Sequence, residues 1–147
     1  MMSSLFDSNF KRWVESACME WNYPEPTEEY YEYFYNRIPN GLRVLLSDGI
    51  EKGVILPDGH RFRIKGLDEN KGPYNWFSNY SNADAPGINW EYFVHVALYS
   101  QLYNQSIEKG IMIKFEDRLM DITLRDKDRL LVCIEVKEKA EDLKKLI

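Results

Sequence analysis

Two stretches near the N-terminus carry apolar residues at helical spacing. Residues 5–21 place aromatic and aliphatic side chains three or four positions apart with polar residues between them, which predicts an amphipathic helix. Two prolines then interrupt the chain. Residues 27–35 begin with acidic residues, which are favoured at a helix start, and they predict a second helix that ends at residues 39–41, Pro-Asn-Gly. The chain is therefore expected to begin with a helical part over residues 1–40.

Alternating polar and apolar residues predict a β-hairpin over residues 53–66, with its turn at residues 57–59, Pro-Asp-Gly. Because successive side chains of a strand point to opposite faces, Arg61, Arg63 and Lys65 share one face of the second strand. Three cations on one face are candidates for binding a nucleic-acid backbone. The alternative is a solvated edge strand, whose charges prevent pairing with other chains.

A polar loop over residues 72–87 precedes the next helix. It is rich in Gly, Pro, Asn and Ser and holds four aromatic residues, Tyr74, Trp76, Phe77 and Tyr80. Aromatic side chains on a polar loop are typical of surfaces that stack on bases, which makes Tyr74 and Trp76 candidate substrate-binding residues. The alternative is a lid that packs on the core.

Residues 89–103 predict a helix, with Asn89 as its N-cap and Gly110 beyond its end. Glu91 lies in the first turn and falls on the apolar side of a helical wheel, so we expect it to face the protein. One turn later, His95 is placed to contact a metal or a phosphate. The alternatives are that the helix dipole alone favours Glu91 and that His95 packs in the core.

The last third of the chain predicts a small sheet. Residues 111–115 form a candidate strand, and residues 119–125 and 130–137 form a candidate hairpin around four charged residues. Both faces of the hairpin hold aliphatic residues, which is typical of strands covered on both sides. A further helix is expected over residues 139–147, so that residues 89–147 form one α+β unit.

Two acids interrupt the apolar pattern of this hairpin, Asp121 on the first arm and Glu135 on the second. They can lie opposite each other on one face only if the loop holds an odd number of residues, about three or five. Two carboxylates in a half-buried site repel each other unless they take up protons, pair with cations or hold a metal. A metal site is the functional interpretation.

The pattern of Asp121, a hairpin and the tripeptide Glu135-Val136-Lys137 resembles the PD-(D/E)XK nuclease superfamily. The order of a helix, a strand, an Asp strand and a Glu-X-Lys strand is similar to the core of that superfamily, although Met120 stands where the name of the motif has Pro. The resemblance implies an α/β (α+β), restriction-endonuclease-like fold, in which helices flank a mixed β-sheet. It covers about the last third of the chain.

The resemblance also implies roles for individual residues. Asp121 and Glu135 would bind Mg²⁺ (or Mn²⁺) together with the Val136 carbonyl, and Lys137 would position or activate the attacking water. Glu91 would be the remaining acid of the family and would complete the acid cluster or hold Lys137. The spacing suits Mg²⁺, which prefers oxygen ligands and keeps several waters.

Composition adds limits to this prediction. The chain has 147 residues, of which 44% are hydrophobic, so we expect a single domain with a sizeable core. No stretch approaches about 18 apolar residues, and the first residues lack the basic and apolar blocks of a signal peptide, so we expect a cytoplasmic protein without a membrane partner. Cys18 and Cys133 are expected to be buried, reduced thiols. The net charge of -5 argues against a large nonspecific DNA-binding surface.

The expected function is metal-dependent hydrolysis of nucleic-acid phosphodiester bonds, with DNA rather than RNA as the expected substrate. A homodimer or an additional domain is compatible with this function. The strand that follows the last helix in the family is absent here, so either the chain is the N-terminal part of a longer protein or the hairpin over residues 53–66 completes the sheet. The alternative function is that of an inactive nuclease-like protein or an unrelated α+β protein-interaction module.

Overall fold

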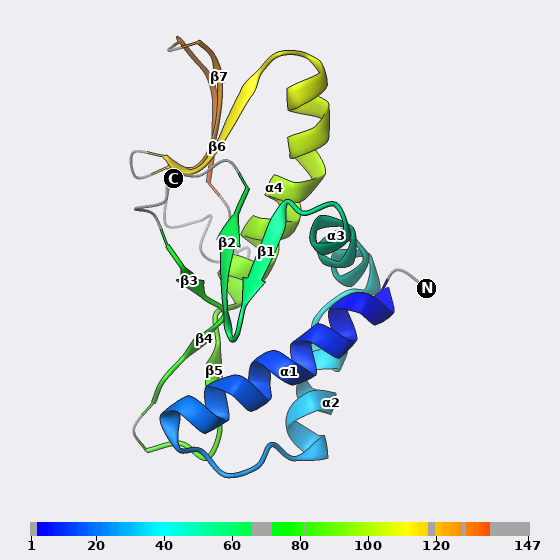
Figure 1. Ribbon diagram of the computed structural model, residues 1–147, viewed down its shortest axis with the longest axis vertical. Helices are drawn as coiled ribbons and strands as arrows, with labels where there is room; N and C mark the ends of the chain where they lie inside the picture. The colour runs from blue at the N-terminus through cyan, green and yellow to red at the C-terminus, as the bar shows by residue number, and fades with distance from the viewer. Residues whose placement is uncertain (1–2, 66–71, 81, 118–119, 128, 136–147) are drawn as a thin grey trace.

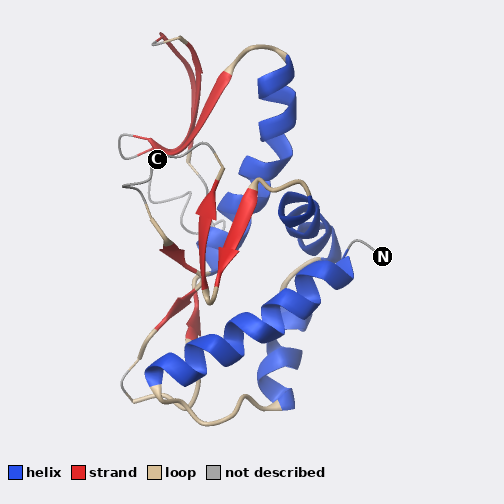
Figure 2. Cartoon of the chain, in the orientation of Figure 1, coloured by secondary structure: helices blue, strands red, loops and turns tan. Residues whose placement is uncertain are grey.

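The computed structural model describes residues 3–65, 72–80, 82–117, 120–127 and 129–135, which form a mixed α+β protein (Figure 1). Within these residues there are four helices and three small antiparallel sheets (Figure 2). The helices are α1 (Ser3–Trp21), α2 (Glu28–Arg37), α3 (Asn40–Glu51) and α4 (Trp90–Glu108). The strands are β1 (Ile55–Asp58), β2 (Arg61–Ile64), β3 (Tyr74–Asn75), β4 (Phe77–Ser78), β5 (Gly87–Ile88), β6 (Met112–Asp117), β7 (Met120–Asp126) and β8 (Arg129–Ile134).

Helices α1 and α2 confirm the two predicted N-terminal helices and build an aromatic core. Phe10 of α1 stacks on Phe34 of α2 with ring centroids 3.7 Å apart, and both side chains are fully buried. Phe93 of α4 packs edge-on against Phe34. Thr27 caps α2, because its hydroxyl accepts a hydrogen bond from the Tyr30 amide. Phe34 of α2 therefore belongs to the core.

Helix α3 was not among the predicted elements. Residues 39–41, Pro-Asn-Gly, are typical of a chain reversal, and the helix contains two glycines, which are poor helix formers. Packing overrides this local preference, because α3 contacts α1, α4 and β1. Its Leu46 is fully buried, and the Ser47 hydroxyl accepts a hydrogen bond from the Phe6 amide.

The two glycines of α3 lie in opposite environments and predict opposite effects on stability. A Cβ on Gly49 would lie 2.6 Å from Ser100 Oγ and 2.7 Å from Ile55 Cδ1, both on buried residues, whereas a Cβ on Gly41 would meet nothing within 4 Å. We expect Gly49→Ala to lower the free energy of unfolding by about 1–3 kcal/mol through overpacking. Gly41→Ala is the matched control and should raise it by up to about 1 kcal/mol. Urea denaturation measures both; equal effects would contradict the close packing at Gly49.

The predicted N-terminal hairpin is confirmed as β1 and β2, but its turn lies elsewhere. Asp58 pairs with Arg61, so the turn is Gly59-His60 instead of residues 57–59. Gly59 has a φ of +60°, which glycine adopts without strain. Strand β3 pairs with the other side of β2, so β2 is central and not the solvated edge strand.

The C-terminal sheet has the strand order β6-β7-β8, and α4 packs against β6 and β7 (Figure 1). The strand over residues 111–115 and both arms of the hairpin are thereby confirmed, the second arm up to Ile134, while residues 119, 136 and 137 lie outside the described residues. The described strands pair only antiparallel, and the hairpin of β1 and β2 belongs to a different sheet. The C-terminal helix expected over residues 139–147 lies outside the described residues.

The register of β7 with β8 corrects the prediction of an odd loop. Asp126 pairs with Arg129, so two residues separate the paired ends of the arms instead of three or five. A β-bulge then restores the parity: Leu124 pairs with Val132 and Arg125 with Leu130, so Leu131 is the extra residue. Beyond the bulge, Ile122 pairs with Ile134.

Strand β8 is more exposed than its apolar sequence predicts. Leu130, Leu131 and Val132 each expose more than 40% of their surface. Cys133 is also exposed, which corrects the prediction of a buried thiol and of a strand covered on both sides, while Cys18 is buried as expected. Both thiols are free. The apolar residues of β8 therefore belong to an edge strand of the described sheet.

Candidate active site

A pocket of about 400 Å³ lies between the start of α4 and strand β7. It brings together three residues that the sequence analysis proposed from separate segments: Glu91 and His95 of α4 and Asp121 of β7. Its remaining lining comes from the residues around the start of α4, Ile88, Asn89, Trp90 and Tyr92. The predicted helix and the predicted Asp strand therefore form one site.

His95 connects the helix to the strand. Its ring is 1% exposed and stacks on Phe115 of β6 with centroids 4.1 Å apart. Nε2 donates a hydrogen bond to the backbone carbonyl oxygen of Asp121 at 2.6 Å. Burial lowers the pKa of His95, so the ring is neutral near pH 7 with its proton on Nε2. These contacts favour a role in positioning Asp121 over direct contact with a substrate.

Glu91 lies at the rim of the pocket. It is exposed, which corrects the expectation that it faces the apolar side of α4. Asn89 occupies the N-cap position, but its side chain makes no capping hydrogen bond. It donates instead to the Asn75 carbonyl at 2.9 Å and accepts from the Ser78 hydroxyl at 2.7 Å. Asn89 thus fixes the short strands to the start of α4.

The register of β7 with β8 bears on the second predicted acid, Glu135, which directly follows β8. Continuing the pairing of Ile122 with Ile134 by one residue on each arm would set Asp121 opposite Glu135. Asp121 is half-buried and Glu135 is exposed. The strand pairing ends at Ile122 and Ile134, so the meeting of the two carboxylates stays a prediction, which the register set by the β-bulge favours. Val136 and Lys137 lie outside the described residues, and their predicted roles stay predictions.

This donor set fits Mg²⁺ better than a metal that needs a full protein cage. Among the residues that the structure describes, no three His, Cys, Asp or Glu side chains converge on one point as a metal site. Mg²⁺ is usually held by one or two carboxylates, with waters and substrate phosphates completing its octahedron. Asp121 lines a pocket with room for water and phosphate, and Glu135 directly follows the strand that pairs with β7.

The predicted basic face does not reach this pocket. Phe62 of β2 packs against Tyr92 of α4, so Arg61 and Arg63 lie on the opposite face of the strand, and Lys65 follows its end. Arg61 already pairs with Glu20 of α1 at 2.9 Å. Arg61 and Arg63 share one face, as predicted, and none of the three cations is among the residues that line the pocket.

Of the two aromatic candidates in the loop over residues 72–87, Trp76 is not a binding residue. It is fully buried, and its ring stacks on Trp13 at 5.0 Å and on Phe93 at 4.7 Å. Tyr74 is half-buried and packs on Phe115 at 5.2 Å. The loop is therefore closer to the alternative, a segment packed on the core.

The sequence analysis did not detect a hydrogen-bonded chain of Ser16, His60 and Glu20. Ser16 Oγ lies 2.9 Å from His60 Nδ1, and His60 Nε2 lies 2.8 Å from Glu20 Oε2. The order of groups is that of a hydrolytic triad, but Ser16 lies in the middle of α1, where the backbone amides are used by the helix and cannot form an oxyanion hole. Hydrogen bonds from Arg61 lower the pKa of Glu20 and hold its carboxylate. We interpret the chain as an anchor between α1 and the hairpin.

No helix in the described part of the protein combines the length and the apolar character needed to cross a membrane. Comparison of the chain with protein-family models, with curated proteins and with solved structures gives no match.

Proposed function

We propose that the chain is a Mg²⁺-dependent nuclease of the PD-(D/E)XK type that hydrolyses phosphodiester bonds, with DNA as the expected substrate. One observation carries the proposal: Glu91 of α4 and Asp121 of β7, 30 residues apart in the sequence, line one pocket. The register of β7 with β8 supports it, because continued pairing would set Glu135 opposite Asp121.

The order of the elements supports the same proposal. Helix α4 is followed by β6, β7 and β8, which form an antiparallel sheet against that helix. This is the order expected for the first part of a restriction-endonuclease-like core, with the Asp on the second strand and the Glu at the end of the third. A mixed sheet flanked by helices is the finer fold that we propose.

In this proposal Asp121 and Glu135, with the Val136 carbonyl, hold the metal. When bound, Mg²⁺ neutralises charge on the phosphate and lowers the pKa of water. His95 keeps Asp121 in place, because its ring is locked between Phe115 and the Asp121 carbonyl. Lys137 orients the attacking water, and Glu91 completes the acid cluster or holds Lys137.

The proposal is tested by a cleavage assay on circular DNA, linear DNA and RNA, with Mg²⁺, Mn²⁺ or EDTA. We expect DNA cutting that needs the divalent metal. Glu91→Gln should lower the cleavage rate by about 10–100-fold, the usual cost of a supporting group at a metal centre. The matched control is Glu108→Gln, at the other end of the same helix, which should leave the rate unchanged. Cutting in EDTA, or no cutting with any metal, would contradict the proposal.

One observation favours a second candidate, a protein-interaction module. The exposed apolar residues of β8, Leu130, Leu131 and Val132, line an edge of the described sheet, where another chain can add a strand. No metal-dependent cutting, together with self-association at micromolar concentration in sedimentation, would support this candidate.

A further inference from the structure

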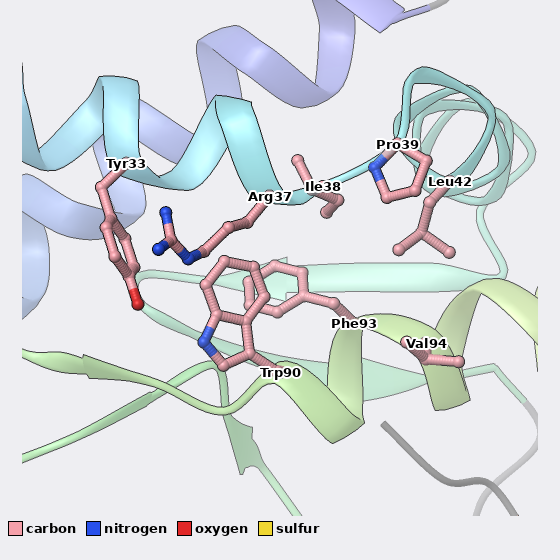
Figure 3. Close-up of a pocket in the computed structure, with 8 residues that line it drawn as sticks. All are labelled: Tyr33, Arg37, Ile38, Pro39, Leu42, Trp90, Phe93 and Val94. Atoms are coloured by element: carbon pink, nitrogen blue, oxygen red, sulfur yellow. The ribbon is translucent and has the colours of Figure 1, made fainter. Parts of the chain in front are cut away.

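A second hollow lies on the other side of the first turn of α4. It has a volume of about 590 Å³, within the usual range of small-molecule sites. Figure 3 shows its two apolar walls: Ile38 and Leu42 on one side, and Phe93 and Val94 on the other. Arg37 and Trp90 lie together at one end of this hollow, which we call the Trp90 groove.

The polar end of the Trp90 groove is formed by a guanidinium on an aromatic ring. The Arg37 guanidinium lies 3.6 Å from the centre of the Tyr33 ring, and Tyr33 is 49% exposed. Within the described residues, Arg37 makes no ion pair with an acid. A guanidinium held against an aromatic ring keeps N–H groups available in a fork, which matches the oxygens of a phosphate.

Trp90 joins this groove to the candidate active site, because it lines both hollows. Its ring is held by stacking on Phe34, with centroids 5.4 Å apart and planes at 14°. Along α4, Glu91 and His95 face the acidic pocket, whereas Trp90 and Val94, one position earlier on the same turns, face the groove. An elongated ligand that places one chemical group against Asp121 can therefore place its next group against Trp90.

We propose that the Trp90 groove binds an unpaired nucleobase next to the scissile phosphate, with a backbone phosphate on Arg37. The inference rests on the proposed function and names its substrate: a nucleic acid with a single-stranded segment at the cut. Nucleobases are planar and stack on aromatic side chains, while the backbone carries the charge that a guanidinium binds. A base inside a groove between two apolar walls has left its duplex stack, so a fully paired substrate is disfavoured.

The first test is binding of a fluorescein-labelled single-stranded DNA 12-mer in EDTA, followed by anisotropy. Arg37→Gln and Tyr33→Ala should each weaken binding about tenfold, in line with the loss of one base-stacking or phosphate contact. Arg12→Gln is the matched control, because Arg12 is an exposed arginine of α1 whose described contact is Asn9. Equal affinities for the wild type, Arg37→Gln and Arg12→Gln would overturn the inference.

A second measurement locates the base. Thymidine 5′-monophosphate should shift the indole N–H signal of Trp90 in an NMR titration, whereas inorganic phosphate at the same concentration should leave that signal in place. In the cleavage assay, Arg37→Gln should raise KM about tenfold with kcat unchanged, and the wild type should cut a DNA with unpaired nucleotides at the site at least about tenfold faster than its fully paired counterpart.

The two proposals fail separately. Metal-dependent cutting that is insensitive to Arg37→Gln and to base pairing would overturn the groove and leave the nuclease standing. Single-stranded DNA that binds in an Arg37-dependent way but is not cut would support the groove and overturn the nuclease. A wild-type protein that neither binds nor shifts Trp90 would overturn the groove directly.

Discussion

Asp121→Asn should abolish metal-dependent cleavage, lowering the rate by at least about 1000-fold, which corresponds to roughly 4 kcal/mol of lost transition-state stabilisation. Asparagine keeps the size of the side chain but removes the charge that would hold Mg²⁺. The fold should survive, because the hydrogen bond from His95 goes to the backbone carbonyl of residue 121, which the substitution keeps. We expect the melting temperature to change by less than about 2 °C. Single-turnover cleavage and thermal unfolding measure the two effects on one sample.

Asp126→Asn is the control for this experiment. Asp126 lies at the other end of the same strand and is exposed beside the turn. Its variant should cut DNA at the wild-type rate. Equal losses of activity in Asp126→Asn and Asp121→Asn would indicate that cleavage depends on the negative charge of β7 and not on a metal ligand at Asp121. Full activity of Asp121→Asn would show that the active site does not lie in this pocket.

Trp76→Ala should destabilise the protein by about 3–5 kcal/mol, the usual cost of truncating a buried aromatic side chain. The ring is fully buried between Trp13, Phe62 and Phe93, and truncation leaves a cavity between α1, β2 and α4. We expect the melting temperature to fall by about 8–15 °C in thermal unfolding followed by circular dichroism.

Met19→Ala is the control, because Met19 is 82% exposed and its removal should cost less than about 0.5 kcal/mol. The core interpretation and the base-stacking interpretation of Trp76 predict different effects of truncating its side chain. A base-stacking tryptophan would weaken DNA binding on truncation and leave the melting temperature nearly unchanged. That result would contradict the core position of Trp76.

The sequence predicts the helices and strands of this protein where one periodicity dominates. Helix α1 follows the spacing of its buried aromatics, and β7 follows its alternation of apolar and polar residues. Helix α3 is the exception, because Gly41 and Gly49 are poor helix formers and weaken its helical pattern. Gly49 is required by the close packing of α3 against α4 and β1. Local preference cannot show such a requirement, which depends on partners far away in the sequence.

The acidic residues of the candidate site could be predicted from the sequence, whereas the side chains that surround them could not. The spacing of Asp121 and Glu135 on two arms of a hairpin predicts a shared face. The bulge at Leu131, which sets the register that this face requires, leaves no clear signal in the sequence. Whether Glu91 or Trp76 is exposed depends on which neighbours cover them. The same holds for the Trp90 groove, whose walls come from α2, α3 and α4.

The most direct test of the central claim is to locate the metal by paramagnetic broadening with Mn²⁺ in amide NMR spectra. The account predicts strong broadening at Asp121, Ile122, Ile134 and Glu135 and weaker broadening at the start of α4, all of it lost in Asp121→Asn. Broadening centred on the acidic start of α2, at Glu28 and Glu29, with the signals of the pocket unchanged, would contradict it.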